Sequence, residues 1–112
     1  MKYPIFSWHI VCFFFLPVVS ALGEIEFVRD VKPILEHNCV SCHREDNAKG
    51  KIRLDNKASA FAGDEVIVPG KPETSLLYKE IIPDGDKGPS MPKNAEPLSG
   101  PEVGMIKRWI LE

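Results

Sequence analysis

The clearest chemical signal in the sequence is the run Cys39-Val40-Ser41-Cys42-His43. Two cysteines at this spacing lie on one turn of the chain, where each thiol can form a thioether with one vinyl group of a haem. The histidine that follows directly is then held beneath the iron and offers a ring nitrogen as an axial ligand. The run therefore predicts one covalently attached haem c, bound through Cys39 and Cys42, with His43 on the iron.

Two other kinds of site also use a Cys-x-x-Cys pair. A zinc site needs about four ligands, taken from separate segments in zinc fingers. Beyond residue 23, the candidate ligands are Cys39, Cys42, His43 and His37, and all four lie close together in the sequence. A thioredoxin-like redox pair belongs to a βαβ pattern, and no such pattern precedes Cys39. Both comparisons favour haem attachment.

The second axial ligand of the iron can be approached by elimination. Beyond residue 23 the only histidine besides His43 is His37, which is tethered too close to the motif to reach the opposite haem face. Two methionines remain. Met105 falls in the apolar pattern of the last predicted helix, where methionine usually serves packing, whereas Met91 lies in a loop far along the chain. Met91 is the predicted ligand, and the alternatives are Met105 or an open site.

Ligation by His43 and Met91 predicts a carrier of single electrons and not an enzyme. A thioether ligand favours Fe(II) and raises the reduction potential. With both axial positions filled, we expect no small-molecule substrate at the iron, and the expected partners are redox proteins. The alternative is an open-site haem protein, peroxidase-like or gas-sensing. A peroxidase-like site would want a distal His or Arg for acid–base work, and no free histidine remains beyond residue 23.

Charge and the remaining polar residues add little chemistry. The formal net charge is −2, and charges of both signs alternate along the chain without a basic block. That pattern predicts no nucleic-acid partner. Arg53 is a candidate contact for a haem propionate, and a plain surface arginine is the competing interpretation.

Residues 1–23 have the three-part pattern of a secretory signal peptide. Lys2 gives a positive start, an apolar run covers residues 10–19, and small residues around Ala21 offer a cleavage site. The run is shorter than the about 20 apolar residues of a membrane span and contains Pro17, so we expect membrane contact only through the uncleaved segment. The pattern predicts export to the periplasm or an equivalent compartment and leaves residues 24–112 as one domain.

Apolar spacing predicts a series of helices separated by irregular loops. The predicted helices cover 24–38, 56–62, 72–82 and 99–112, with extended runs at 52–55 and 66–70, a polar loop at 44–50 and a long loop at 83–98. Pro33 leaves two options for the first helix, which either begins at Asp30 or follows an earlier, kinked turn.

Cap residues and apolar positions add detail to the later helices. Ala58, Ala60 and Phe61 are expected to face inward from the second helix, and Gly63 is expected to close it in the C′ position. Ser99 and Glu102 form a capping box at the start of the last helix.

Five stretches of the sequence resemble segments of the planctomycete-type cytochrome c domain. They are Glu26–Leu35 before the haem motif, the Gly50–Asp55 segment with its Ile-Arg-Leu-Asp pattern, Ile67–Leu76, Ser90–Pro92, and Leu98–Ile110. The stretches occur in the family's order and together with the motif span essentially all of 24–112. Arg44, where the family often has glycine, and Lys93, where a second proline is common, are departures that do not touch the chemistry.

The resemblance implies an all-α, class I cytochrome c-like fold, with helices wrapped around one covalently bound haem and long irregular loops. It implies that the first and last helices pack together, with Phe27 against Trp109 as the expected contact. It also implies Met91 as the distal ligand. Such domains commonly front longer proteins, so a stand-alone carrier and an electron-transfer module of a larger oxidoreductase assembly are both expected possibilities.

Overall fold

The computed structural model describes residues 2–4 and 23–112, so the predicted signal peptide lies almost wholly outside the described residues. The elements in chain order are the π-helical turn η1 (Phe27–Val31), α1 (Lys32–Asn38), β1 (His43–Arg44), β2 (Asn47–Ala48), the 3₁₀ turn η2 (Lys49–Lys51), α2 (Lys57–Ala62), the 3₁₀ turn η3 (Pro72–Thr74), α3 (Leu76–Ile81) and α4 (Gly100–Leu111). This largely helical content agrees with the predicted all-α class. Within the described residues, no helix is both long and apolar enough to cross a membrane.

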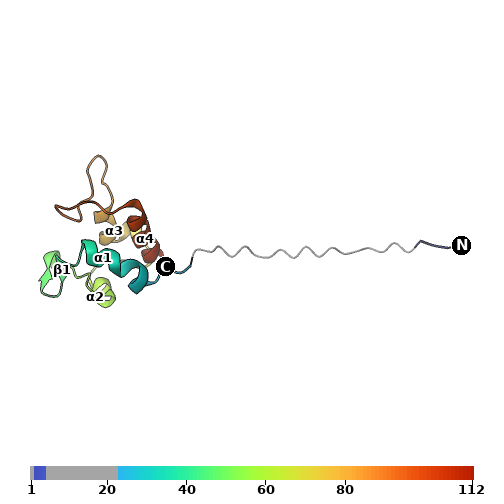
Figure 1. Ribbon diagram of the computed structural model, residues 1–112, viewed down its shortest axis with the longest axis horizontal. Coiled ribbons are helices and arrows are strands. Elements are labelled where there is room, and N and C mark those ends of the chain that lie inside the picture. Colours follow the sequence, from blue (N-terminus) through green and yellow to red (C-terminus); the bar gives the residue numbers. More distant parts are fainter. Residues whose placement is uncertain (1, 5–22) are drawn as a thin grey trace.

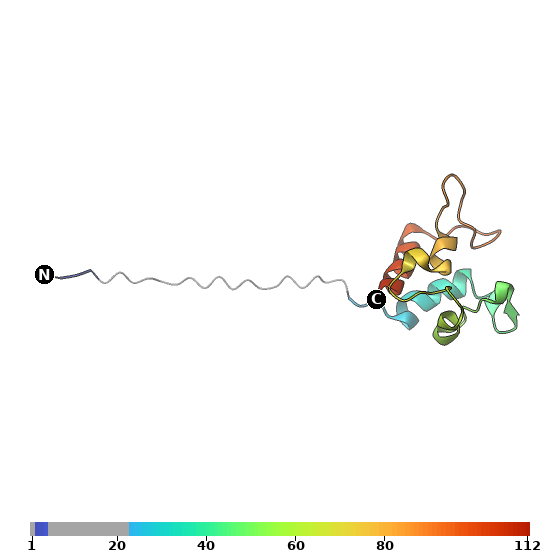
Figure 2. The same ribbon diagram turned by 180° about the vertical axis from the view of Figure 1, so that it is seen from behind.

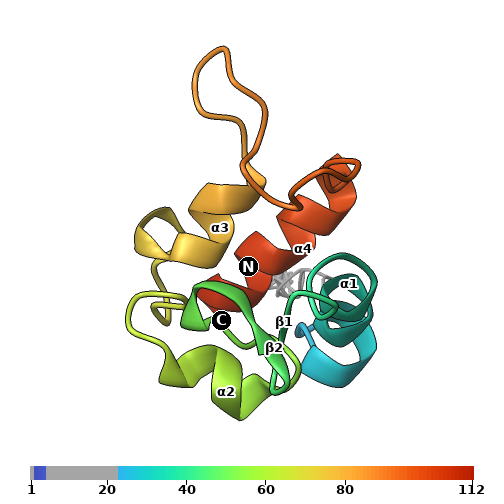
Figure 3. The ribbon, with the colours of Figure 1, turned by 90° about the vertical axis from the view of Figure 1, so that its left-hand side faces the viewer.

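The helices surround α4, whose apolar side forms much of the core. Figure 1 shows α1 between the β1–β2 hairpin and α4, with α3 beside α4 and α2 on the other side of α1. In Figure 3, which is turned by 90° from Figure 1, α3 and α1 lie on opposite sides of α4. Ile106, Trp109 and Ile110 of α4 are buried, and so are Val31 and Leu35 of the first helical segment. The core therefore lies where α4 meets the start of the domain.

Trp109 joins three elements through aromatic contacts. Its ring centroid lies 5.3 Å from that of Phe27 and 5.4 Å from that of Phe61, which meets it edge-on. Aromatic pairs at such separations stabilise a fold beyond the area they bury. The expected contact between the first and last helices is therefore confirmed, and α2 joins it through Phe61.

The first helical segment follows the second of the two predicted options. The turn η1 precedes α1, and Pro33 occupies an early position of α1 where its missing N–H costs little. The Asp30 carboxylate accepts a hydrogen bond from the Glu26 backbone N–H at 2.8 Å and two from the Arg29 guanidinium at 2.7 and 2.9 Å. These bonds hold the turn η1 that precedes α1.

The start of the described domain is fastened to its end. The Ile25 backbone N–H donates to Glu112 Oε2 at 2.8 Å, and Arg108 Nη2 donates to the Gly23 carbonyl at 3.3 Å. Figure 2 shows the C-terminus beside the point where the folded part of the chain begins. The capping box of α4 is confirmed, since Ser99 Oγ accepts from the Glu102 N–H and Glu102 Oε2 accepts from the Ser99 N–H. Both ends of α4 are therefore held.

Two predictions for α2 and its end are wrong. Ala58 is exposed, while Ala60 is buried and Phe61 half-buried. Gly63 has φ −76° and ψ 136°, which is extended backbone and not the left-handed C′ conformation. Position 63 needs a glycine for a different reason, because a Cβ there would lie 2.8 Å from Val66 Cγ2. Close packing, and not turn geometry, excludes a side chain here.

The predicted helix over 72–82 is in fact two elements divided at Ser75. Ser75 has φ −80° and ψ 123°, so η3 ends there and α3 begins after it. Its side chain is fully buried. The Ser75 hydroxyl accepts from the Val68 N–H at 2.9 Å and donates to the Lys71 carbonyl at 2.8 Å. The predicted extended run over 66–70 is also wrong, because one turn ends at Val66, whose N–H bonds to the Gly63 carbonyl, and another begins at Val68, whose carbonyl accepts from the Lys71 N–H.

We predict that Ser75→Ala lowers the free energy of unfolding by about 1–3 kcal/mol, because it leaves the Val68 N–H without its partner inside the fold. Denaturant unfolding measures the loss. Ser59→Ala is the matched control, since the Ser59 hydroxyl makes no hydrogen bond to any other described residue. Equal stabilities for the two variants would contradict the role given to Ser75.

Asp30 predicts a pH dependence of stability. Hydrogen bonds from Arg29 and then from the Glu26 backbone lower the pKa of Asp30 to about 2, from an ordinary value of 3.8. The folded state therefore prefers the ionised carboxylate, and this contribution is present above pH 3.8 and is lost as the pH falls toward 2. We expect wild type to be more stable than Asp30→Asn at neutral pH, and the gap in melting temperature to close over that window. A gap of constant width would contradict the prediction.

Candidate functional site

The three residues of the predicted haem motif lie on the turn that follows α1. The Cys42 N–H donates to the Cys39 carbonyl at 3.2 Å, and the His43 N–H donates to the same carbonyl at 3.1 Å. These bonds keep the chain helical in outline, so the two sulfur-bearing residues are one turn apart, as attachment to one haem requires. Cys39 is 8% exposed and Cys42 is half-buried. His37, on the preceding turn, is exposed.

The environment of Cys39 bears on the alternative uses of the pair. Burial raises the pKa of the Cys39 thiol to about 11. A thioredoxin-like redox pair needs an accessible thiol with a lowered pKa, and Cys39 has the opposite character. For the zinc alternative, no three His, Cys, Asp or Glu side chains among residues 2–4 and 23–112 are grouped so that they could hold a metal ion.

The His43 ring is held by a backbone carbonyl from the next stretch of chain. His43 Nδ1 lies 3.2 Å from the Ile52 carbonyl oxygen, and the Leu54 N–H donates to the His43 carbonyl at 2.8 Å. A carbonyl oxygen only accepts hydrogen bonds, so this contact places the ring proton on Nδ1. Nε2 then carries the lone pair, which is the form of imidazole that binds a metal.

A small hairpin within the predicted loop 44–50 brings Ile52 back to His43. β1 pairs with β2 in antiparallel register, with His43 opposite Ala48. Gly50 and Lys51 then both take left-handed backbone, with φ of 65° and 61°. Gly50 adopts this conformation at no cost, but Lys51 does so against its steric preference. The reversal delivers Ile52 to the His43 ring.

Met91 and Met105 lie in different surroundings. Met91 is half-buried in the loop after α3 and packs against the apolar core that includes Cys39. Its backbone N–H donates to the Glu80 carbonyl at 2.9 Å, which ties it to the last turn of α3. The loop itself projects beyond α3 in Figure 1. Met105 is half-buried on α4 but is not among the described residues that pack against that core.

Arg53 is engaged by a neighbouring carboxylate. Its Nε and Nη2 donate to the two oxygens of Asp55 at 3.1 and 2.8 Å. This hydrogen bonding is the main cause that lowers the pKa of Asp55 and raises that of Arg53. The predicted propionate contact of Arg53 stays a prediction, and any such contact would share the guanidinium with Asp55.

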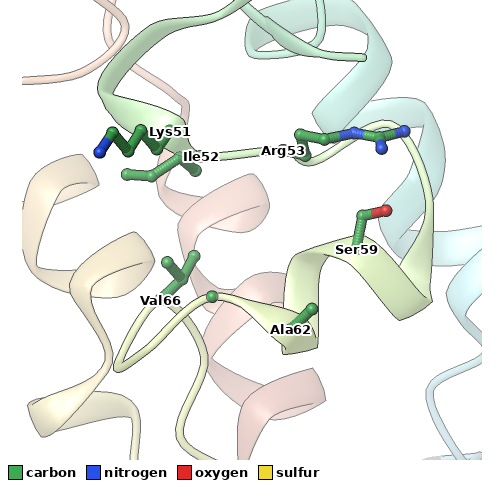
Figure 4. Close-up of a pocket in the computed structure, with 7 residues that line it drawn as sticks. Lys51, Ile52, Arg53, Ser59, Ala62 and Val66 are labelled. Carbon is green, nitrogen blue, oxygen red and sulfur yellow. The ribbon is translucent and has the colours of Figure 1, made fainter.

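A pocket of about 250 Å³ lies beside this pair. Its lining residues are Lys51, Ile52, Arg53, Ser59, Ala62, Gly63 and Val66. In Figure 4, Arg53 and Ser59 lie on one side of the pocket and Lys51 and Val66 on the other. The pocket is therefore adjacent to the carbonyl that holds His43.

Sequence reasoning missed two residues at this site. Ile52 acts through its backbone carbonyl, which leaves no signal in the residue type. Asp55 had a weak signal, since the alternation of residues 52–55 places it on the same face as Arg53.

A scan against protein-family models matches residues 39–95 to the family described as Planctomycete cytochrome C. The match begins at Cys39 and includes Cys42, His43, Arg53 and Met91, and it covers just over half of the chain. The resemblance found in the sequence at 26–35 and 98–110 lies outside it. Searches of curated proteins and of solved structures give no match.

We predict that Gly63→Ala, at the edge of the pocket, lowers the free energy of unfolding by about 1–3 kcal/mol. The added Cβ would overlap the stiff, β-branched side chain of Val66. Denaturant unfolding measures the change. Gly88→Ala is the matched control, since a Cβ there meets nothing within 4 Å and Gly88 is exposed. An equal effect of the two substitutions would count against the close approach at Gly63.

Proposed function

This chain belongs to the planctomycete cytochrome c family, and we propose that it is an exported monohaem c-type cytochrome that carries single electrons. In this proposal, one haem c is attached through Cys39 and Cys42, His43 is one axial ligand and Met91 the other. The observation that carries the proposal is the 3.2 Å contact from His43 Nδ1 to the Ile52 carbonyl. It prepares Nε2 of the motif histidine to bind iron.

The donor set of the site fits this cofactor. Thioether formation needs two thiols on one turn, and the motif supplies them at its start and its fourth position. A bound haem c supplies a one-electron change between Fe(III) and Fe(II). The chain's own part is to hold His43 in one orientation and to keep water away with apolar residues. Leu54 and Val66, both buried, lie on the segments next to His43 and the pocket.

Met91 is proposed over Met105 on two grounds. Its backbone is anchored at Glu80 and its side chain packs against the apolar core, so the loop is fixed at the methionine. Met105 has a fixed helical position on α4, which leaves it little freedom to approach an iron. A methionine ligand raises the reduction potential and suits a carrier.

Export and partners complete the proposal. The signal-peptide pattern at residues 1–23 supports delivery to the periplasm or an equivalent compartment. Electron donors and acceptors there would be redox proteins. No substrate is proposed at the iron, because two axial side chains occupy it.

The test is expression with a haem-maturation system, followed by a pyridine haemochrome assay and spectra of the oxidised protein. We expect one covalent haem per chain and a methionine-to-iron charge-transfer band. The band should be lost in Met91→Ala and kept in Met105→Ala, which is the matched control.

Three results would contradict parts of the proposal. Stoichiometric zinc in place of haem would remove it altogether. Binding of carbon monoxide or cyanide by native protein at low concentration would favour an open-site sensor or peroxidase-like protein. Loss of the band in Met105→Ala alone would move the distal ligand to α4.

A further inference from the structure

Residues 52–55, which include the Ile52 carbonyl that accepts from His43, have two faces with different roles. In extended chain, alternate side chains point to opposite sides. Ile52 and Leu54 face the core, where Leu54 is buried and Ile52 packs against it. Arg53 and Asp55 share the other face, with side chains that are 32% and 21% exposed.

The outer face carries a geometrically specific interaction. The Arg53 guanidinium and the Asp55 carboxylate meet through two hydrogen bonds, at 3.1 and 2.8 Å. Such forked pairs fix the relative direction of both groups, in a way that a single lysine contact does not. Because the two residues flank Leu54, the fork holds the backbone between them extended.

The start of this segment needs such support. Lys51 has φ +61°, a conformation that a residue with a side chain adopts at a cost. Ile52 follows with φ −103° and ψ 129°, and its carbonyl direction depends on how the chain leaves the turn. The far end of the segment is fixed by Asn56, whose side chain caps α2 by accepting from the Ser59 N–H.

We propose that the Arg53–Asp55 pair is a positioning device for His43, which keeps the Ile52 carbonyl aimed at Nδ1 and so sets how strongly the imidazole donates to the iron. This inference rests on the proposed function, because it assumes that His43 is an axial ligand. Arg53 and Asp55 act through Ile52 and are positioning residues, not ligands.

The chemical consequence is a shift of reduction potential. A hydrogen bond accepted from Nδ1–H raises the basicity of the ring and strengthens Nε2 as a donor. A stronger donor stabilises Fe(III) more than Fe(II). Loosening the pair weakens the hydrogen bond and therefore raises the potential.

The direct electrostatic effect of each charge on the iron predicts shifts of the reduction potential with a different pattern of signs. Removing the Asp55 carboxylate deletes a negative charge and raises the potential through space. Removing the Arg53 guanidinium deletes a positive charge and lowers it. A positioning role raises the potential in both variants, so the sign in the arginine variant separates the two mechanisms.

The experiment uses full-length holoprotein and measures the midpoint potentials of wild type, Arg53→Gln, Asp55→Asn and the double variant. We expect both single variants to shift upward by up to about 59 mV, which is a tenfold change in the oxidised-to-reduced ratio of a one-electron couple. The double variant should shift no further than the larger single shift, because both substitutions break the same fork. Hydrogen exchange at His43 Nδ1–H in the reduced protein should accelerate in all three.

The chain offers a matched control pair at the same spacing. Arg44 and Asp46 form an ion pair at 2.8 Å on the exposed hairpin directly after His43, with side chains 49% and 78% exposed. Arg44→Gln and Asp46→Asn change the same charges near the iron without touching residues 52–55. They should leave the Nδ1–H exchange unchanged and shift the potential, if at all, in opposite directions.

Conservative variants keep the test independent of folding defects. If Arg53→Gln does not fold, Arg53→Lys retains the charge but cannot form the fork, and the same upward shift is expected. Exchanging the two residues, Arg53→Asp with Asp55→Arg, should restore the wild-type potential and exchange rate.

The outcomes separate this inference from the proposed function. A wild-type protein without covalent haem overturns both. A wild-type protein with haem ligated by His43, together with a lowered potential in Arg53→Gln or unchanged Nδ1–H exchange in both single variants, overturns the positioning role alone.

Discussion

A carbonyl oxygen nine residues further along the chain holds the ring of His43, with Nδ1 and the Ile52 oxygen 3.2 Å apart. This contact depends on a succession of local structures. α1 has to end so that the motif forms a turn, the β1–β2 hairpin has to reverse the chain, and two left-handed residues have to return it. A failure at any step would leave the ring free to rotate, and a rotating imidazole is a poor axial ligand.

The turn after α1 keeps its place because α1 is held at its other end. The rings of Phe27 and Trp109 pack together, and Phe61 meets the same indole from α2. Hydrogen bonds from Ile25 to Glu112 and from Arg108 to Gly23 fasten the two ends of the domain to each other. α4 therefore acts as the fixed reference for α1, for α2 and for the adjoining α3.

The Ile-Arg-Leu-Asp segment at residues 52–55 gains a physical meaning from this arrangement. Its apolar residues face the core and its charged residues pair on the outside, so one short stretch both seals the domain and steadies a carbonyl.

The long loop after α3 is held only in part. Its middle is exposed around Asp84–Lys87, but Met91 is tied down at Glu80 and Leu98 is buried where the chain rejoins α4. The loop is thus anchored at the methionine.

The sequence alone predicted the chemistry proposed for the motif and most of the helices. Cys39, Cys42 and His43 predict haem attachment by type and spacing, and α4 is predicted by its capping box and apolar stripe, because these signals are local in the chain. Where contacts between distant residues decide the backbone, the sequence was a poor guide. Ser75 divides a predicted helix because Val68 and Lys71 bond to its hydroxyl, and position 63 has no room for a side chain because Val66 lies against it.

The acceptor for His43 shows the same division. A histidine after Cys-x-x-Cys predicts a metal ligand, but the atom that orients its ring is a backbone carbonyl oxygen, which every residue possesses. Only the folded chain selects Ile52 for this task, because the hairpin and the turn at Gly50 and Lys51 decide which carbonyl reaches the ring. Residue type predicts what the motif binds, and tertiary structure decides which atom holds its histidine.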